Sequence, residues 1–421
     1  MMQRIAHSQD FTSNKRRVEM RSAFYRDATR PGDIFKQLRL VINMSQAVLF
    51  LLASWISIVI GLSLSAPQIF AQSNSQTQEF DTPEAIKQAF ERARKLERSD
   101  DNFEAAETLF NIYTTETDYK AQAIARVTTN LLESGFPNAA SYFFIRTLQT
   151  QNRQAIRYVL LKLPELLNAV GGDLLRPYVL RYTKEDDYDK DIRSHFHYFL
   201  GKDFLLKGDT AQALNALSKV TSSTVQPQAA YLRGTAYAIS GQLSQALENF
   251  KFCRNRASRI GAEGEDLEQR CNASIARVYY EANDNRKAEI FYDDIPKSSY
   301  VFTDILFEQA WNAYARNDMN RSLGKLVSYR SPSLSFVFNP EVEVLRTQSF
   351  LALCLYDDVT KTISEFNDKY SNVGSQMKNF LLQHDRDLGG FYSLARQAFY
   401  SKLHNSTPIN RALNRFIRGP Y

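Results

Sequence analysis

One stretch of the chain repeats itself after 33 residues, and this repeat limits the fold more than any other feature. Residues 197–220 read HYFLGKDFLLKGDTAQALNALSKV, and residues 231–250 read YLRGTAYAISGQLSQALENF. A fixed period near 34 with these residue types indicates an array of two-helix repeats. The matching pairs are Gly201 and Gly234, Phe204 and Tyr237, Gly208 and Gly241, Ala213 and Ala246, and Leu217 and Phe250.

The spacing within the repeat gives each residue type a structural role. A small residue such as Gly201 lets the first helix approach its partner closely. Gly208 lies where that helix must end, because Gly tolerates the left-handed terminal conformation. Ala213 and Leu217 lie one turn apart on one face of the second helix. This order of small, aromatic, Gly, Ala and large apolar residues resembles the tetratricopeptide repeat (TPR) family; a coincidental pair of helical hairpins is the alternative.

The same pattern continues on both sides in weaker form. It predicts hairpins over 82–116 and 119–150, with Asp101 aligned to Gly135, and a degenerate pair near 153–169 and 173–183. With a closing helix near 375–403, we expect an all-α superhelical solenoid of about eight TPR-like hairpins over 82–403. The other expected contact residues are Ala106, Phe110, Ala140, Phe144, Ala276, Tyr279, Ala288, Tyr292, Ala310, Ser322, Leu326, Phe350, Leu353, Thr362 and Phe366.

Two late units and the segment between them carry a second resemblance. Residues 310–326 and 344–366, joined through SPSLSFVFNPE, resemble a subgroup of bacterial cell-envelope TPR proteins. The resemblance implies that the chain works in the bacterial envelope, and it brings no catalytic motif with it. Between the hairpins, the charged run Lys184–Asp191 is expected to be a solvated turn.

The positive charge of the chain is concentrated at its N-terminal end. Residues 1–40 contain nine Lys or Arg and four acidic residues, which accounts for +5 of the net charge of +6. The remaining body is almost neutral and shows no electrostatic footprint for nucleic acid. No nucleic-acid partner is therefore expected. The C-terminal tail, residues 404–421, is also basic.

An uncharged apolar segment follows the basic tail. It covers residues 41–66 and is followed by a polar linker at 72–81. The basic residues before it orient the N-terminus to the cytoplasm. Two interpretations stay open: a signal peptide cleaved after Ala71, or an uncleaved transmembrane helix. Both predict an exported body, either periplasmic or anchored in the inner membrane; a buried hairpin in a cytosolic protein is the third alternative.

The three cysteines are Cys253, Cys271 and Cys354. Cys253 ends one expected repeat and Cys271 opens the next, on either side of an insertion. Neighbouring helices would bring the two thiols together, and an exported protein could pair them as a disulfide. The alternative is two buried, reduced thiols that serve as small apolar residues. Cys354 lies within the apolar run LALCLY, which is expected to be helical, and Cys354 is expected to be a core residue.

Motifs for catalysis, cofactors and metals are absent from the sequence. There is no Gly-rich phosphate loop, no zinc-protease motif and no nucleophile elbow. His195 and His197 are two residues apart and so lie on different helix faces. We therefore expect no enzyme activity, no cofactor and no metal site.

The first helices of the hairpins carry a stripe of aromatic and basic residues. Positions three before, one after and four after the small residue share one helix face. Tyr, Trp and Arg dominate binding hot spots, so we expect a non-catalytic scaffold or adaptor that holds a peptide or partner helix of an envelope protein in this groove. Packing between neighbouring repeats is the alternative role for these residues, and a regulatory subunit of a cell-wall enzyme, or a divergent hydrolase, is the alternative function. The expected groove residues are Tyr198, Lys202, Tyr231, Arg277, Tyr280, Phe307, Trp311 and Tyr314.

Overall fold

The structure is a computed structural model that describes residues 82–114, 118–334, 337, 339–383, 387–400, 410 and 413–414. The predicted basic tail, apolar segment and linker of residues 1–81 lie outside the described residues. So does most of the C-terminal tail. Within the described ranges the chain is all-helical and has no strand, which confirms the all-α prediction.

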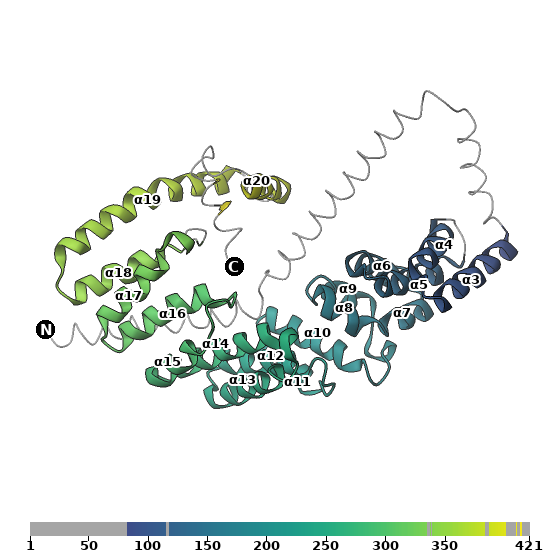
Figure 1. The fold of residues 1–421 in the computed structure, drawn as a ribbon, viewed down its shortest axis with the longest axis horizontal. Helices are drawn as coiled ribbons and strands as arrows, with labels where there is room; N and C mark the ends of the chain where they lie inside the picture. The colour runs from purple at the N-terminus through teal and green to yellow at the C-terminus, as the bar shows by residue number, and fades with distance from the viewer. Residues whose placement is uncertain are drawn as a thin grey trace, which may run out of the picture. The chain divides into compact units, whose positions relative to one another are not determined.

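Consecutive helices pack against one another in antiparallel pairs, as in a helical solenoid (Figure 1). Each helix therefore contacts mainly its sequence neighbours, which is typical of repeat architectures. The α-helices are α3 (Pro83–Arg98), α4 (Asn102–Thr114), α5 (Lys120–Glu133), α6 (Pro137–Gln149), α7 (Arg153–Leu160), α8 (Leu163–Val170), α9 (Arg176–Tyr182), α10 (Arg193–Leu206), α11 (Thr210–Ser218), α12 (Gln226–Ile239), α13 (Leu243–Ala257), α14 (Glu265–Glu281), α15 (Asn285–Asp293), α16 (Phe302–Ala315), α17 (Met319–Tyr329), α18 (Glu341–Ala352), α19 (Tyr356–Gln383) and α20 (Leu388–Tyr400).

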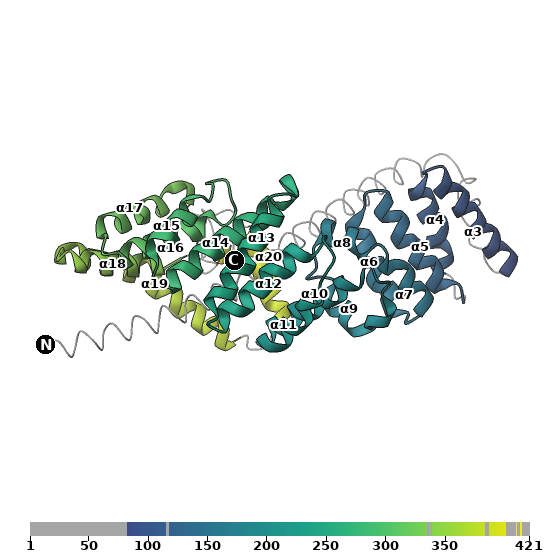
Figure 2. The same ribbon diagram turned by 90° about the horizontal axis from the view of Figure 1, so that it is seen from below.

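The described residues fall into two compact units, divided within α12. The N-terminal unit ends at Leu232 and the C-terminal unit begins at Arg233. In the C-terminal unit, α13 to α17 follow one another as neighbouring antiparallel helices (Figure 2). That residues 82–403 form one continuous array stays a prediction.

In the part of the chain that the structure describes, the same turn ends the first helix of seven hairpins. One residue adopts a left-handed conformation, with φ between 60° and 82°. The next residue donates its N–H to the carbonyl five residues earlier, as Asp209 does to Phe204 at 2.9 Å. This is the Schellman arrangement, which satisfies carbonyls at the helix end and fixes where the second helix starts. The left-handed residues are Asp100, Gly135, Gly208, Gly241, Asn283, Asn317 and Cys354.

The small residues of the first helices lie in close contact with the second helices. A Cβ atom added to Gly201 would lie 2.4 Å from Cγ of Leu217, and one added to Gly234 would lie 2.7 Å from the ring of Phe250. Leu217 and Phe250 are fully buried. The sequence prediction that these glycines allow close helix approach agrees with this geometry.

The first hairpin differs by one residue from the predicted alignment. Asp100, not Asp101, holds the left-handed turn that corresponds to Gly135. The spacing between the two repeats is therefore 35 residues, and Leu109 takes the fully buried position that was assigned to Phe110. Phe110 is exposed instead and meets Phe143 edge-on, with ring centroids 5.9 Å apart.

The degenerate region contains three short helices, α7, α8 and α9, where a pair was predicted. The first break follows Leu160, because Pro164 has no N–H to donate and its ring disfavours a continuous helix. Pro164 lies in the first turn of α8, and Pro177 has the same place in α9. The predicted turn at Gly171-Gly172 is present and ends α8. The additional break between α7 and α8 was not predicted.

The charged run after α9 is solvated in part: Lys184, Asp186, Asp189, Lys190 and Asp191 are exposed, as predicted, whereas its middle is a packed corner. Asp187 is 6% exposed and accepts hydrogen bonds from Arg153 at 2.5 Å and from the Lys184 backbone at 2.8 Å. Tyr188 is buried, and its hydroxyl lies 2.9 Å from that of Thr183. Burial raises the pKa of Tyr188, so its phenol stays neutral in this corner.

The last hairpin also differs from the prediction. Cys354 is exposed and lies in the turn after α18, because its backbone takes the left-handed position that Gly or Asn holds elsewhere. It is therefore not a core residue. The predicted closing helix near 375–403 is divided: α19 continues to Gln383, and α20 begins at Leu388.

Replacing the close-contact glycine Gly234 by Ala should destabilise the C-terminal unit by about 1–3 kcal/mol, because the new Cβ overlaps the ring of Phe250. Urea unfolding followed by the fluorescence of Trp311, in a Trp55→Phe background, measures this. Gly324→Ala is the matched control: it lies within α17, where an added Cβ would meet no atom within 4 Å, and should stabilise by about 0.5–1 kcal/mol. Equal stability of the two variants would contradict the close contact.

Candidate functional site

Three aromatic side chains form a row along α16. Phe307, Trp311 and Tyr314 are spaced by four and three residues, so they share one helix face. Neighbouring rings meet edge-on, with centroids 6.4 Å apart for Phe307 and Trp311 and 5.8 Å apart for Trp311 and Tyr314. All three side chains are half-buried. This aromatic row thus combines packed ring edges with surface that remains open to solvent.

The row rests on a small apolar core between α16, α17 and α18. Fully buried Ala310 faces fully buried Leu326, and Leu345 of α18 completes the cluster. Tyr329 closes one end, where its ring lies 6.1 Å from that of Phe307. Burial raises the pKa of Tyr329, so its phenol remains neutral. The support beneath the row is therefore apolar and without charge.

A pocket of about 780 Å³ lies on another face of α16, between the turn after α15, α17 and the segment that follows α17. Phe302 and Leu306 form part of its apolar lining. Lys297 and Lys325 supply two cations, and Ser331 is among its hydroxyl groups. This α16–α17 pocket can receive a ligand that has both an apolar and an anionic or hydrogen-bonding part.

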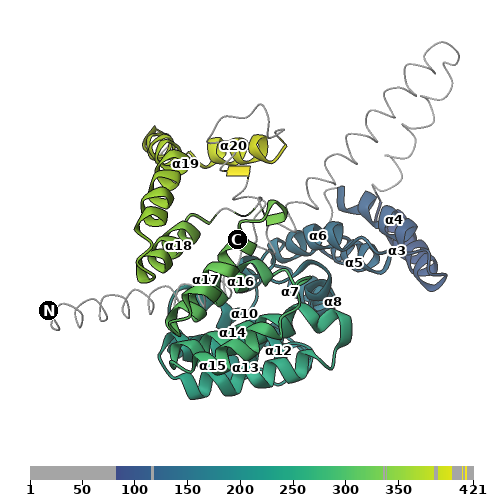
Figure 3. The same ribbon diagram turned by 60° about the vertical axis from the view of Figure 1, so that its left-hand side comes forward.

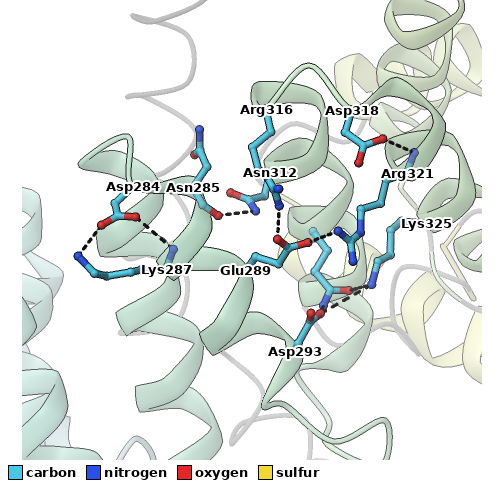
Figure 4. A network of polar contacts seen from close by, with 11 residues as sticks. Asp284, Asn285, Lys287, Glu289, Asp293, Asn312, Arg316, Asp318, Arg321 and Lys325 are labelled. Carbon is cyan, nitrogen blue, oxygen red and sulfur yellow. Dashed lines mark hydrogen bonds and ion pairs between the residues drawn. The ribbon is translucent and has the colours of Figure 1, made fainter.

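A polar chain crosses one wall of the pocket (Figure 4). The Gln309 amide donates to Asp293 at 2.7 Å, and the Lys325 ammonium donates to the Gln309 oxygen at 3.0 Å. The same ammonium lies 3.9 Å from the Asp293 carboxylate. The Asp293 carboxylate therefore balances part of the positive charge of Lys325. The charge of Lys297 is then the less compensated of the two in the lining.

The same network joins α15, α16 and α17 beyond the pocket (Figure 4). Glu289 of α15 forms ion pairs with Arg316 and, at 2.7 Å, with Arg321. The side-chain amide of Asn312 donates to the Asn285 carbonyl at 3.0 Å. Asp318 caps α17 by accepting from the Arg321 N–H at 3.0 Å. These contacts hold the three helices as one block, so the aromatic row lies on a fixed element.

Arg277, one of the expected groove residues, is buried. It is 1% exposed, and its Nε donates to both oxygens of Glu308, at 3.1 Å and 2.9 Å. A second guanidinium nitrogen donates to Glu308 at 2.8 Å. This bidentate pair joins α14 to α16. Burial raises the pKa of neighbouring Tyr292, and the Glu308 carboxylate acts in the same direction.

Three further groove residues are also buried. Lys202 forms an ion pair with Asp173 at 2.8 Å, and Tyr231 and Tyr280 are enclosed by their neighbours. For these three and for Arg277, burial favours packing over capture of a partner. Tyr198 is half-buried in the N-terminal unit. The structure brings together only the three expected residues of α16.

The repeat pattern of the sequence does not predict the α16–α17 pocket. Its wall includes Ser331, Ser333 and Leu334, which belong to the long connection after α17. The available signal is the break in the repeat period at 331–340, where serines and two prolines replace the start of the next helix. Serines and prolines are typical of loops, and their pattern does not indicate that the segment folds back as a pocket wall.

Cys253 of α13 and Cys271 of α14 lie next to one another in the C-terminal unit. Their Sγ atoms are 2.09 Å apart, as in a disulfide, and their Cα atoms are 6.3 Å apart. This Cα separation lies within the range that a disulfide spans. Both side chains are fully buried.

No protein-family model matches the chain, and no curated protein matches it either. In the described part of the chain, no helix is long and apolar enough to cross a membrane. The same residues contain no group of three His, Cys, Asp or Glu side chains arranged to hold a metal ion.

Removing one partner of the Arg277–Glu308 pair should be strongly destabilising. Glu308→Leu leaves the buried guanidinium without this carboxylate, which costs about 3–5 kcal/mol. The double variant Arg277→Met, Glu308→Leu should recover most of that loss, because a buried pair can be replaced by apolar residues. Urea unfolding of both variants measures the difference.

Glu289→Leu is the control, because its ion pairs with Arg316 and Arg321 lie nearer the surface; it should cost about 1 kcal/mol or less. A Glu308→Leu variant no less stable than the Glu289→Leu variant would show that the Arg277–Glu308 pair does not join the two repeats.

Proposed function

We propose that the chain is a non-catalytic interaction scaffold built from TPR-like hairpins, and that it binds a peptide segment of another protein on α16. The aromatic row of Phe307, Trp311 and Tyr314 is the observation that carries this proposal. Aromatic side chains are over-represented among residues that supply most of the binding energy in interfaces. In this proposal the row takes the place of the longer groove that the repeat pattern suggested.

The physical basis of the proposal is the fixed position of the three rings. Each ring already contacts its neighbour, so binding costs little side-chain entropy. The Glu289 and Asp293 contacts hold α15 and α17 against α16, which preserves the spacing of the rings. A partner that covers the row would gain apolar contact at a small ordering cost. Its preferred segment is one with apolar side chains at one-turn intervals.

We further propose that the body works in an exported, oxidising compartment of a bacterial envelope. The apolar segment at 41–66 supports export, whether it is cleaved after Ala71 or retained as an anchor. The juxtaposed thiols of Cys253 and Cys271 support an oxidising environment, because intracellular thiols stay reduced. Retention of the segment would tether the scaffold and raise the local concentration of a membrane partner.

A photo-crosslinking residue at position 314 tests the binding surface in cells. It should capture one partner segment, which mass spectrometry identifies and which is then synthesised as a peptide. Trp311→Ala should weaken binding of that peptide by about 30-fold, equivalent to about 2 kcal/mol, because the row loses its largest ring. Fluorescence anisotropy measures the dissociation constants.

The matched control is Ile290, an apolar residue of α15 that is 59% exposed and lies outside the row. A crosslinker there should not capture the same segment, and Ile290→Ala should leave the dissociation constant unchanged. Equal crosslinking at both positions, or normal binding by Trp311→Ala, would reject α16 as the binding surface.

Export predicts an oxidised Cys253–Cys271 pair in the protein isolated from its own compartment. Non-reducing peptide mapping should find the two cysteines joined and Cys354 free. Closing the 18-residue separation stabilises by about 3 kcal/mol in the chain-entropy model, so Cys253→Ala should lower the melting temperature much more under oxidising than under reducing conditions. Two free thiols in freshly isolated protein would count against the proposed compartment.

A further inference from the structure

The long helix α19 carries a continuous apolar stripe with heptad spacing. Its apolar residues follow one another at intervals of four and three residues over more than five helical turns. This alternation has a period of 3.5 residues, which keeps one seam facing a second helix along a supercoil. The stripe consists of Val359, Ile363, Phe366, Tyr370, Val373, Met377 and Phe380.

The stripe is less covered than the same positions of other second helices. Counted from the left-handed turn residue, Val359 and Ile363 correspond to Ala288 and Tyr292 of α15, which are buried at 1% exposure or less. Ile363 is 47% exposed, and Val359 is half-buried. Thr362 is the one side chain of α19 that is buried. The closing contact of a repeat is therefore incomplete here.

The neighbouring helices of the same chain are too short to cover the stripe. At 1.5 Å per residue, α18 with 12 residues spans about 18 Å and α19 with 28 residues about 42 Å. Figure 1 shows α19 continuing beyond α18, and Figure 3 shows α20 near the far end of α19. There the ring of Phe391 lies 5.3 Å from that of Phe380. Of the other six members, Ile363 is exposed and the remaining five are half-buried.

The contacts of the array indicate what kind of element belongs on the stripe. In the C-terminal unit, the second helices α13, α15 and α17 each pack against the following first helix. Among the described residues, the helix that follows α19 is α20, and it makes no comparable contact with α19, so this end of the array is open there. A solenoid end needs a cover, and the 3.5-residue period requires that the cover be another helix.

The charges around the stripe fit an identical helix. By helical spacing, the acidic and basic residues of α19 lie off the stripe; Lys369 is beside it, and Glu365 forms an ion pair with Arg346 of α18 at 3.2 Å. In a parallel pair Lys369 faces Gly374 of the second copy, so like charges do not meet. In an antiparallel pair, the residues that flank the seam on the same side as Lys369 would lie opposite the same set of residues in the second copy. The remaining residues that flank the seam are Thr360, Thr362, Asn367, Gly374, Gln376, Leu381 and Gln383.

We propose that α19 is a dimerisation helix, which pairs with α19 of a second copy of this chain as a parallel two-stranded coiled coil. The interface is isologous: beyond the reach of α18, each stripe residue meets its own equivalent across a two-fold axis. The dimer closes the open end of both arrays and presents two aromatic rows. It does not depend on the proposed peptide binding at α16.

The full-length chain, purified in detergent because of its apolar N-terminal segment, provides the first test. Sedimentation across a concentration series should give twice the chain mass. Met377→Glu introduces a charge into the seam beyond the reach of α18 and should raise the dimer dissociation constant about tenfold or more. Asn379→Glu, two residues further on the outer face, should leave it unchanged.

A cysteine variant tests the orientation without disturbing the fold. Because Cys354 is exposed, the background is Cys354→Ser. Val373→Cys should form an intermolecular disulfide under mild oxidation, since residue 373 meets its equivalent in a parallel pair. Ser375→Cys on the outer face should not.

Three results would overturn the proposal. A monomer at every concentration would mean that another helix covers the stripe. A dimer unaffected by Met377→Glu would mean that the chain associates elsewhere. Equal crosslinking of Val373→Cys and Ser375→Cys would mean that the two helices do not meet along this seam.

Discussion

The left-handed turn at the end of each first helix is the constraint on which the arrangement of the hairpins depends. It recurs seven times with the same backbone hydrogen bonds, although glycine occupies only three of the seven positions. Asp100, Asn283 and Asn317 tolerate this conformation better than most residues, whereas Cys354 adopts it at some cost. Because the turn fixes the start of the second helix, it also decides which side chains face the first. Gly201 against Leu217 and Gly234 against Phe250 follow from that register.

Contacts between neighbouring repeats use the side chains that the repeat pattern suggested for a binding groove. Arg277 reaches Glu308 across two first helices, and Lys202 reaches Asp173 within the N-terminal unit. Each such pair removes a cation from water. This is tolerated only where a well-placed carboxylate forms an ion pair with the cation. At α16 the corresponding residue is Trp311, which needs no counter-ion and remains half-buried. Buried Arg277 therefore belongs to a contact between repeats, whereas half-buried Trp311 belongs to a surface that can receive a partner.

The sequence predicted the local features of the fold better than the placement of side chains in the candidate site. Periodicity found the hairpins, because Gly, Ala and large apolar residues at fixed spacing reflect contacts within one repeat. It misplaced Asp101 and Phe110 by one residue, since the turn after α3 has Asp100 where three of the other turns have the glycine that marks the register. Periodicity also placed Cys354 in the core, because the same apolar run can continue from a helix into the turn that follows it. Burial of Lys202 and Tyr231 depends on neighbouring repeats, which spacing within a single repeat does not specify.

The period of the apolar pattern distinguishes α19 from the helices before it. A helix that packs within a solenoid needs only one or two turns of contact, as Ala246 and Phe250 provide in α13. A strict alternation of four and three residues over seven positions exceeds that need, because α18, with 12 residues, is less than half as long as α19, with 28. Surface apolar residues scattered singly need no explanation, but a continuous seam does. Selection for contact with a second helix along the whole length would keep this spacing in register, whereas packing within one hairpin would preserve only its first two turns.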